Sequence, residues 1–149
     1  MTDPMSELKA LPALRLAQIS TVVSDTAEIS AVVGPLFDTL TQRLAKAGLR
    51  VEGRGIHTYF GRPDGSRIDV AAAVPVDAQV GPIEGVEIVD LAAEQTAAAV
   101  VHRGPARRIA DAWQTFAVAT DEQGLTPFGV HRQVHLHAPE DSEDWVVEL

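Results

Sequence analysis

The sequence predicts an α+β fold built from two similar strand–helix–strand–strand halves. Gly34-Pro35 and Gly104-Pro105 each precede a helical pattern. Each helical pattern ends at a Gly-Leu pair, and two strand-like stretches follow it in both halves. Repeated units of this kind combine into one pseudo-symmetric structure, because each unit buries its apolar face against its neighbour. We therefore expect a mainly antiparallel sheet of about eight strands, with two helices covering one face.

The composition is typical of one globular domain that spans residues 1–149. Hydrophobic residues make up 46% of the chain, which is enough for a single core. The absence of cysteine excludes disulfides and thiolate metal sites and is consistent with a cytoplasmic location. The formal net charge of −9 argues against nucleic-acid binding, which requires clustered Lys and Arg. No apolar run approaches the roughly 20 residues of a membrane span, and no signal peptide is recognisable.

The first half covers about residues 12–80 and follows an expected flexible arm at residues 1–11. Gly34-Pro35 is expected to open the helix, since proline is tolerated in the first turn, and Gly48 is expected to end it. Segment 61–65 has Pro and Gly at the positions that a tight turn requires, so it predicts a hairpin. The strands expected in this half cover residues 14–21, 55–60 and 68–76.

The second half covers about residues 85–149 and follows a Gly- and Pro-containing linker at residues 77–85. Pro105 is expected to open its helix and Gly124 to end it. The apolar stripe of this helix consists of Ile109, Trp113, Phe116 and Thr120. The strands expected in this half cover residues 86–91, 96–102, 128–137 and 145–149.

Several segments, taken in their order and spacing, carry a resemblance to a known family. They are Leu14-Arg15-Leu16-Ala17, Thr58-Tyr59-Phe60 with Pro63-Asp64-Gly65, Val101-His102-Arg103-Gly104-Pro105, Arg132-Gln133-Val134-His135-Leu136 and Trp145-Val146-Val147-Glu148-Leu149. In this combination the chain resembles the GyrI-like small-molecule-binding superfamily, over about residues 14–149. This superfamily includes the C-terminal effector domains of MerR-type and AraC-type multidrug regulators. The resemblance implies a cleft between the two halves, lined by aromatic and aliphatic side chains, with an acidic residue in its wall.

The resemblance implies that Glu148, on the last strand, is the acid that attracts lipophilic cations. A partly buried carboxylate is costly to desolvate, and a delocalised cation stacked on aromatic rings offsets that cost. The alternative is a solvated glutamate near the end of the chain. The family usually has Glu and Tyr where this chain has Gln133 and His135, a difference that weakens a cation-only site and broadens it toward neutral ligands.

The candidate ligand-binding residues combine this acid with aromatic and polar residues of the expected cleft. Trp113 offers a large face and an N–H that needs a partner, with plain core packing as the alternative. Tyr59 lies on the hairpin that lines the cleft by analogy, with cross-strand packing as the alternative. The full set is Tyr59, Phe60, Trp113, Gln133, His135 and Glu148.

Two other groups of residues have simpler interpretations. His131, His135 and His137 share one strand face by parity, so capture of Zn or Ni is one alternative. No cysteine or well-placed carboxylate completes such a site, and we expect a polar strand face with no metal and no cofactor. A basic group is too small for nucleic-acid binding, and we interpret it as a solvated face. Its members are Arg103, Arg107, Arg108 and Arg132.

Two functions remain open from the sequence. We favour a stand-alone, non-enzymatic module that holds or senses hydrophobic aromatic compounds, cations among them, with a protein partner as a variant. Only about a dozen residues precede the module, so we do not expect the chain itself to be a transcription factor. The alternative is a hydrolase of strained, drug-like electrophiles, an activity that some relatives have. Glu148 would then act as general base or electrostatic stabiliser, with Tyr59 or His135 assisting.

Overall fold

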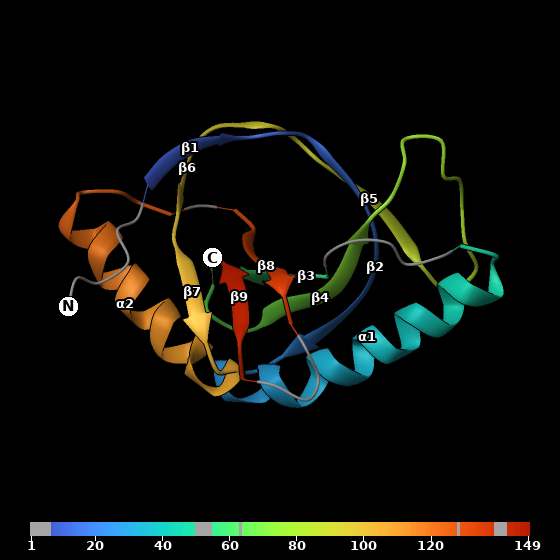
Figure 1. The fold of residues 1–149 in the computed structure, drawn as a ribbon, viewed down its shortest axis with the longest axis horizontal. Helices are drawn as coiled ribbons and strands as arrows, with labels where there is room; N and C mark the ends of the chain where they lie inside the picture. The colour runs from blue at the N-terminus through green and yellow to red at the C-terminus, as the bar shows by residue number, and fades with distance from the viewer. Residues whose placement is uncertain (1–6, 50–54, 63, 128, 139–142) are drawn as a thin grey trace.

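The computed structural model describes residues 7–49, 55–62, 64–127, 129–138 and 143–149, and its fold is α+β, as predicted. In Figure 1 both helices lie along one side of the molecule, and β1 and β6 arch together over the opposite side. The helices are α1 (Ile29–Lys46) and α2 (Ile109–Glu122), each preceded by a short 3₁₀ turn (Thr26–Glu28 and Ala106–Arg108). The strands are β1 (Glu7–Leu11), β2 (Leu14–Val23), β3 (Ile56–Gly61), β4 (Ile68–Pro75), β5 (Glu87–Leu91), β6 (Glu94–Ala99), β7 (Val101–Gly104), β8 (His131–His137) and β9 (Trp145–Glu148).

The strand order shows the two-fold character that the repeat predicts. Seven strands form one sheet in the order β5-β2-β4-β3-β8-β9-β7, so β2, β4 and β3 of the first half mirror β7, β9 and β8 of the second. The halves meet where β3 pairs with β8, with His57 opposite Gln133. The remaining strands, β1 and β6, precede β2 and β7 and pair with each other as a separate ribbon. The ribbon therefore also joins the two halves.

Both helices pack on the same face of the sheet. Leu40 and Leu44 of α1 are almost completely buried against β2 and β4, and each stabilises the fold by roughly 2 kcal/mol. Ile109 and Phe116 of α2 pack against Val147 of β9. Because successive residues of a strand point to opposite faces, the other face has its own apolar cluster. That cluster consists of Leu16, Ile56 and Ala73, with Leu14, Leu91 and Val134 around it. Among the described residues, no helix has the length and apolar character needed to cross a membrane.

The first helix begins at Ile29 and not at Pro35, so this prediction was wrong. Pro35 lies inside α1, and Gly34 before it lacks the Cβ that would collide with the proline ring. The Thr39 hydroxyl donates a hydrogen bond to the Pro35 carbonyl, with a distance of 3.0 Å between the oxygens. The helical segment starts instead with the 3₁₀ turn Thr26–Glu28, which directly precedes α1 and is capped by the side chain of Asp25.

The ribbon accounts for two further differences from the predicted elements. Residues 7–11, expected within a flexible arm, form β1, while residues 1–6 lie outside the described residues. The single strand expected at 96–102 is two strands, because the chain leaves the ribbon after β6 and then pairs with β9 as β7. Between them, Val100 exchanges backbone hydrogen bonds of 3.1 and 2.8 Å with Leu149. The chain therefore passes from the ribbon into the seven-stranded sheet at Val100.

The hairpin between β3 and β4 is confirmed. The two strands pair from Ile56 opposite Ala73 to Gly61 opposite Ile68. The Gly65 N–H donates to the Arg62 carbonyl at 2.9 Å, and Gly65 has a φ of 73°, a conformation that favours glycine. Pro63 of this turn, Phe128 and residues 139–142 of other predicted elements lie outside the described residues.

Candidate functional site

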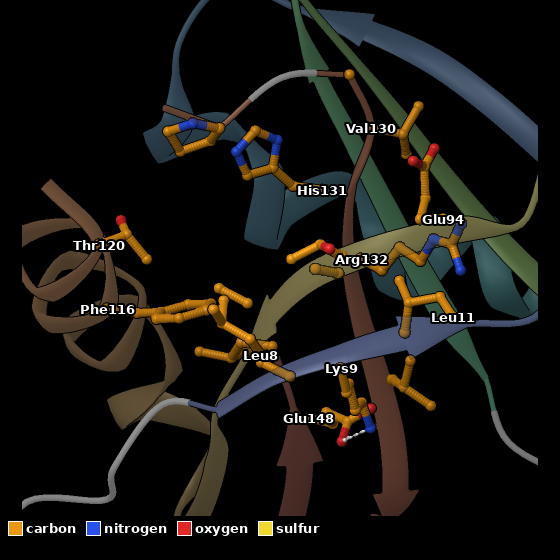
Figure 2. Close-up of a pocket in the computed structure, with 18 of the residues that line it drawn as sticks. Leu8, Lys9, Leu11, Glu94, Phe116, Thr120, Val130, His131, Arg132 and Glu148 are labelled. Atoms are coloured by element: carbon orange, nitrogen blue, oxygen red, sulfur yellow. Dashed lines mark hydrogen bonds and ion pairs between the residues drawn. The ribbon is translucent and has the colours of Figure 1, made fainter. Parts of the chain in front are cut away.

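A cavity of about 680 Å³ lies between the β1–β6 ribbon, the second half of the sheet and α2. Leu14, Leu91 and Val134 of the apolar cluster opposite the helices line it, and Trp113 and Phe116 approach from α2. In Figure 2, Phe116 projects from α2 on one side, and the side chains of β1 lie on another. Sites for drug-sized molecules span about 300–1,000 Å³ and are mostly apolar, so this cavity has a suitable size and lining.

An ion pair between the ribbon and the sheet lies at this cavity. Lys9 Nζ of β1 is 2.7 Å from Glu148 Oε2 of β9, and the exposed fractions of the two side chains are 34% and 22% (Figure 2). Glu148 is opposite Val134 in the sheet, so its side chain points to the cavity face. The candidate acid therefore has a cationic partner within the protein.

Arg132 of β8 is the second cation of the cavity lining. Its side chain is half-buried, and Figure 2 shows it near Glu94 of β6. Burial lowers the pKa of the Arg132 guanidinium, and the negative charge of Glu94 opposes this effect. Within the described part of the chain, the Arg132 guanidinium forms no hydrogen bond and no ion pair. The cavity thus contains a partly desolvated guanidinium whose N–H groups have no acceptor among the described residues.

A polar cluster lies on the opposite face of the sheet, where the two halves meet beneath the helices. Gln133 of β8 is at its centre and is almost completely buried. Its amide oxygen accepts hydrogen bonds from Trp113 Nε1 at 2.9 Å and from the Tyr59 hydroxyl at 3.2 Å. Its amide nitrogen lies 3.2 Å from His57 Nδ1 and 2.9 Å from His135 Nε2. The single hydrogen of the Tyr59 hydroxyl also has His57 Nδ1 within reach as an acceptor, at 3.0 Å, so Gln133, Tyr59 and His57 form one connected network.

The contacts of the cluster favour one protonation state of its two histidines. The Trp113 indole N–H can only donate, so the Gln133 amide oxygen must face it. The amide nitrogen then faces both imidazoles as a donor, which favours unprotonated His57 Nδ1 and His135 Nε2 as its acceptors. A proton on either nitrogen would place two donors against each other. The hydrogen-bond geometry therefore favours two neutral histidines.

Burial acts in the same direction as this geometry. It lowers the pKa of His57 from 6.5 to about 3, with a further contribution from His135. Burial also lowers the pKa of His135 from 6.5 to about 4 and raises that of Tyr59 above its ordinary value. Phe37 of α1 closes the cluster, with its ring centroid 5.0 Å from that of His57. The described residues contain no buried side-chain nitrogen or oxygen without a hydrogen-bond partner.

The six candidate ligand-binding residues fall into separate groups in the structure. Trp113 and Glu148 line the cavity, and Trp113 also reaches the polar cluster through its indole N–H. Tyr59, Gln133 and His135 belong to the cluster and do not line the cavity. Phe60 is half-buried in β3 and is part of neither. The structure therefore brings Tyr59, Trp113, Gln133 and His135 together, and of these four only Trp113 also lines the cavity with Glu148.

The three histidines considered as metal ligands do not converge. The ring centroid of His131 lies 6.1 Å from that of Trp113, and His135 belongs to the polar cluster. An irregularity in the β8–β9 pairing lies between His135 and His137, and His137 is exposed. No group of three or more His, Cys, Asp or Glu side chains among the described residues is arranged to hold a metal ion.

Sequence reasoning missed two charged residues of the cavity. Arg132 was interpreted as part of a solvated basic face, although its parity with Val134 on β8 would place it on the cavity side. Lys9 was assigned to a flexible arm, and no local pattern indicates that this segment pairs with β6. Another member of the basic group, Arg107, does lie at the exposed surface, where it pairs with Glu143.

Comparison with known families shows to which family the chain belongs. The GyrI-like small molecule binding domain matches residues 4–149. The chain belongs to the GyrI-like family. No curated protein sequence matches this GyrI-like chain. The family assignment agrees with the two-fold sheet, the two helices on one face and the resemblance noted from the sequence segments.

Solved structures show the same fold at low sequence identity. The regulator EcmrR in its DNA complex is 19% identical, with a TM-score of 0.74, and the match covers 97% of this chain and 55% of that chain. The GyrI-like chain thus spans about half the length of that EcmrR chain. SAV2435 bound to tetraphenylphosphonium is 14% identical, with a TM-score of 0.67 and coverage of 97% and 90%. A hydrolase from Listeria innocua is 12% identical, with a TM-score of 0.58 and coverage of 99% and 91%.

Proposed function

We propose that this GyrI-like protein binds a small hydrophobic, aromatic molecule in the cavity between the β1–β6 ribbon, α2 and the sheet. The observation that carries the proposal is the cavity itself, about 680 Å³ in volume and lined by leucine, alanine and aromatic side chains. Burial of apolar ligand surface there contributes roughly 25 cal/mol per Å² before the cost of association. The tetraphenylphosphonium bound to SAV2435 has the apolar, aromatic character that this cavity suits.

A binding role has more support than the hydrolase alternative. That alternative requires Glu148 to act together with Tyr59 or His135. The strand register turns Glu148 to the cavity face and His135, like Tyr59, to the face beneath the helices. Glu148 is also held by Lys9 at 2.7 Å. The chemical groups named for hydrolysis therefore do not surround one reacting centre.

A cavity-narrowing substitution tests the proposed function. Ala117 of α2 is exposed and lines the cavity, so Ala117→Trp narrows it without changing the core. Ala110→Trp, at an exposed position of the same helix that does not line the cavity, is the matched control. In a thermal-shift screen of lipophilic cations and neutral aromatic compounds, we expect hits for the natural protein and for the control. A ligand at 100 times its Kd stabilises the folded state by about 2.7 kcal/mol.

The Ala117→Trp variant should lose most of the stabilisation that the ligand gives to the natural protein. Equal shifts for Ala117→Trp and Ala110→Trp would place the ligand elsewhere and contradict the proposal. A screen without any hit would contradict small-molecule binding of this class altogether.

A further inference from the structure

The charges that line the cavity are arranged unevenly. Among the described residues of its lining, the ionised side chains are two cations and two anions: Lys9, Arg132, Glu94 and Glu148. Lys9 and Glu148 neutralise each other at 2.7 Å. Glu94 and Arg132 attract each other electrostatically, but no ion pair or hydrogen bond joins them. The Glu148 carboxylate is already paired with Lys9. No described residue accepts a hydrogen bond from the Arg132 guanidinium, so its N–H groups are available to a ligand.

A cationic ligand gains little from such a cavity. It would have to displace the Lys9 ammonium from Glu148, and the displaced ammonium would lose a charge-assisted hydrogen bond. Glu94 could attract a cation, but Arg132 lies beside it and repels one. The negative charge of Glu148 is therefore already neutralised by Lys9.

An anionic group meets the opposite situation at Arg132. The guanidinium is half-buried and has lost part of its hydration, so it gains more from a new acceptor than an exposed arginine would. Its planar fork fits the two oxygens of a carboxylate. Apolar residues such as Leu11, Leu14 and Val134 line the same cavity and can contact the body of the ligand.

We propose that the cavity selects amphipathic carboxylates, in which an aromatic or aliphatic body lies against the leucine and alanine lining and the carboxylate binds the Arg132 guanidinium. This inference rests on the proposed function and names its ligand class. Lys9 has a separate role, as a counter-ion that keeps Glu148 from attracting cations. Glu94 weakens the carboxylate site through repulsion.

A matched ligand series tests this inference by isothermal titration calorimetry. Naphthaleneacetate, naphthaleneacetamide and naphthylethylammonium share one aromatic body and differ in charge. We expect the carboxylate to bind about tenfold more tightly than the amide, because hydrogen bonds between two charged groups are stronger than those to a neutral amide, and we expect the ammonium compound to bind most weakly. Arg132→Met should remove the preference for the carboxylate and leave the affinity for the amide unchanged.

Two further variants separate a specific site from a general charge effect. Glu94→Gln removes the repelling carboxylate, so it should raise the affinity for naphthaleneacetate several-fold. Arg103→Met removes an exposed arginine that does not line the cavity, and should have no effect. Equal affinities of all three ligands, or a preference for the carboxylate that persists in Arg132→Met, would overturn this inference while leaving the proposed function intact. Tightest binding of the ammonium compound, lost in Glu148→Gln, would overturn it in favour of a cation site. Failure of all three ligands to bind would count against the proposed function itself.

Discussion

Replacing Gln133 by Leu is expected to destabilise the protein by about 3 kcal/mol or more. Leucine has nearly the same size but cannot accept from Trp113 and Tyr59 or donate to His57 and His135. Each buried polar group left without a partner costs about 1–3 kcal/mol. The remaining contact of 3.0 Å between the Tyr59 hydroxyl and His57 Nδ1 and partial access to water reduce the sum. The expected loss is a large share of the 5–15 kcal/mol that typically stabilises a domain.

Urea denaturation measures this loss directly. Gln114→Leu is the matched control, because Gln114 is exposed on α2 and the same substitution there should change stability by no more than about 0.5 kcal/mol. If Gln133→Leu were as stable as this control, the hydrogen-bond network would have no energetic role. The account of the neutral histidines would then lose its support.

The second large effect is a loss of stability in mild acid. The folded-state pKa values of His57 and His135 are about 3 and about 4, below the ordinary value of 6.5. Unfolded chains therefore bind protons near pH 6.5, and folded chains do so only at lower pH. Stability is unaffected by these groups well above pH 6.5 and falls as the pH decreases from 6.5 toward 4.

The slope of this effect can be measured variant by variant. Each histidine contributes up to about 1.4 kcal/mol per pH unit, so the two together remove roughly 3 kcal/mol between pH 6.5 and about pH 5. His57→Gln removes one of the two groups and should reduce the slope by about half. Unfolding midpoints in urea at a series of pH values give the slope. A slope unchanged in His57→Gln would mean that other groups cause the acid sensitivity.

Much of the architecture could be predicted because the signals are local. The hairpin between β3 and β4 has Gly65 at a positive φ, which the sequence indicates through its Pro-Asp-Gly segment. The second helix follows Pro105 and the apolar stripe of Ile109 and Phe116 packs on the sheet as expected. The start of α1 could not be found in this way, because proline favours the first turn of a helix, and Pro35 lies inside α1 against this preference.

The site depends on contacts between distant segments, so the sequence indicates less of it. Lys9 reaches Glu148 only because β1 pairs with β6, and neither partner predicts the other. Trp113 was identified as a residue whose N–H needs a partner, and that partner is Gln133. The sequence indicated Gln133 as a candidate ligand-binding residue and as a departure from the family pattern, but not as the centre of a hydrogen-bond network. Its complete hydrogen bonding becomes apparent when β3 and β8 lie side by side.

A hydrophobic small molecule is expected to occupy the cavity, and alanine methyl groups can report on its binding. Ala97, Ala98 and Ala99 line the cavity from β6, whereas buried Ala72 lies opposite His57 on the helix side of the sheet. We would record methyl NMR spectra of alanine-labelled protein during a titration with naphthaleneacetamide. The account predicts saturable shifts for the three β6 alanines and none for Ala72. Shifts of Ala72 without shifts of the β6 alanines would place the ligand at the polar cluster beneath the helices and contradict the account.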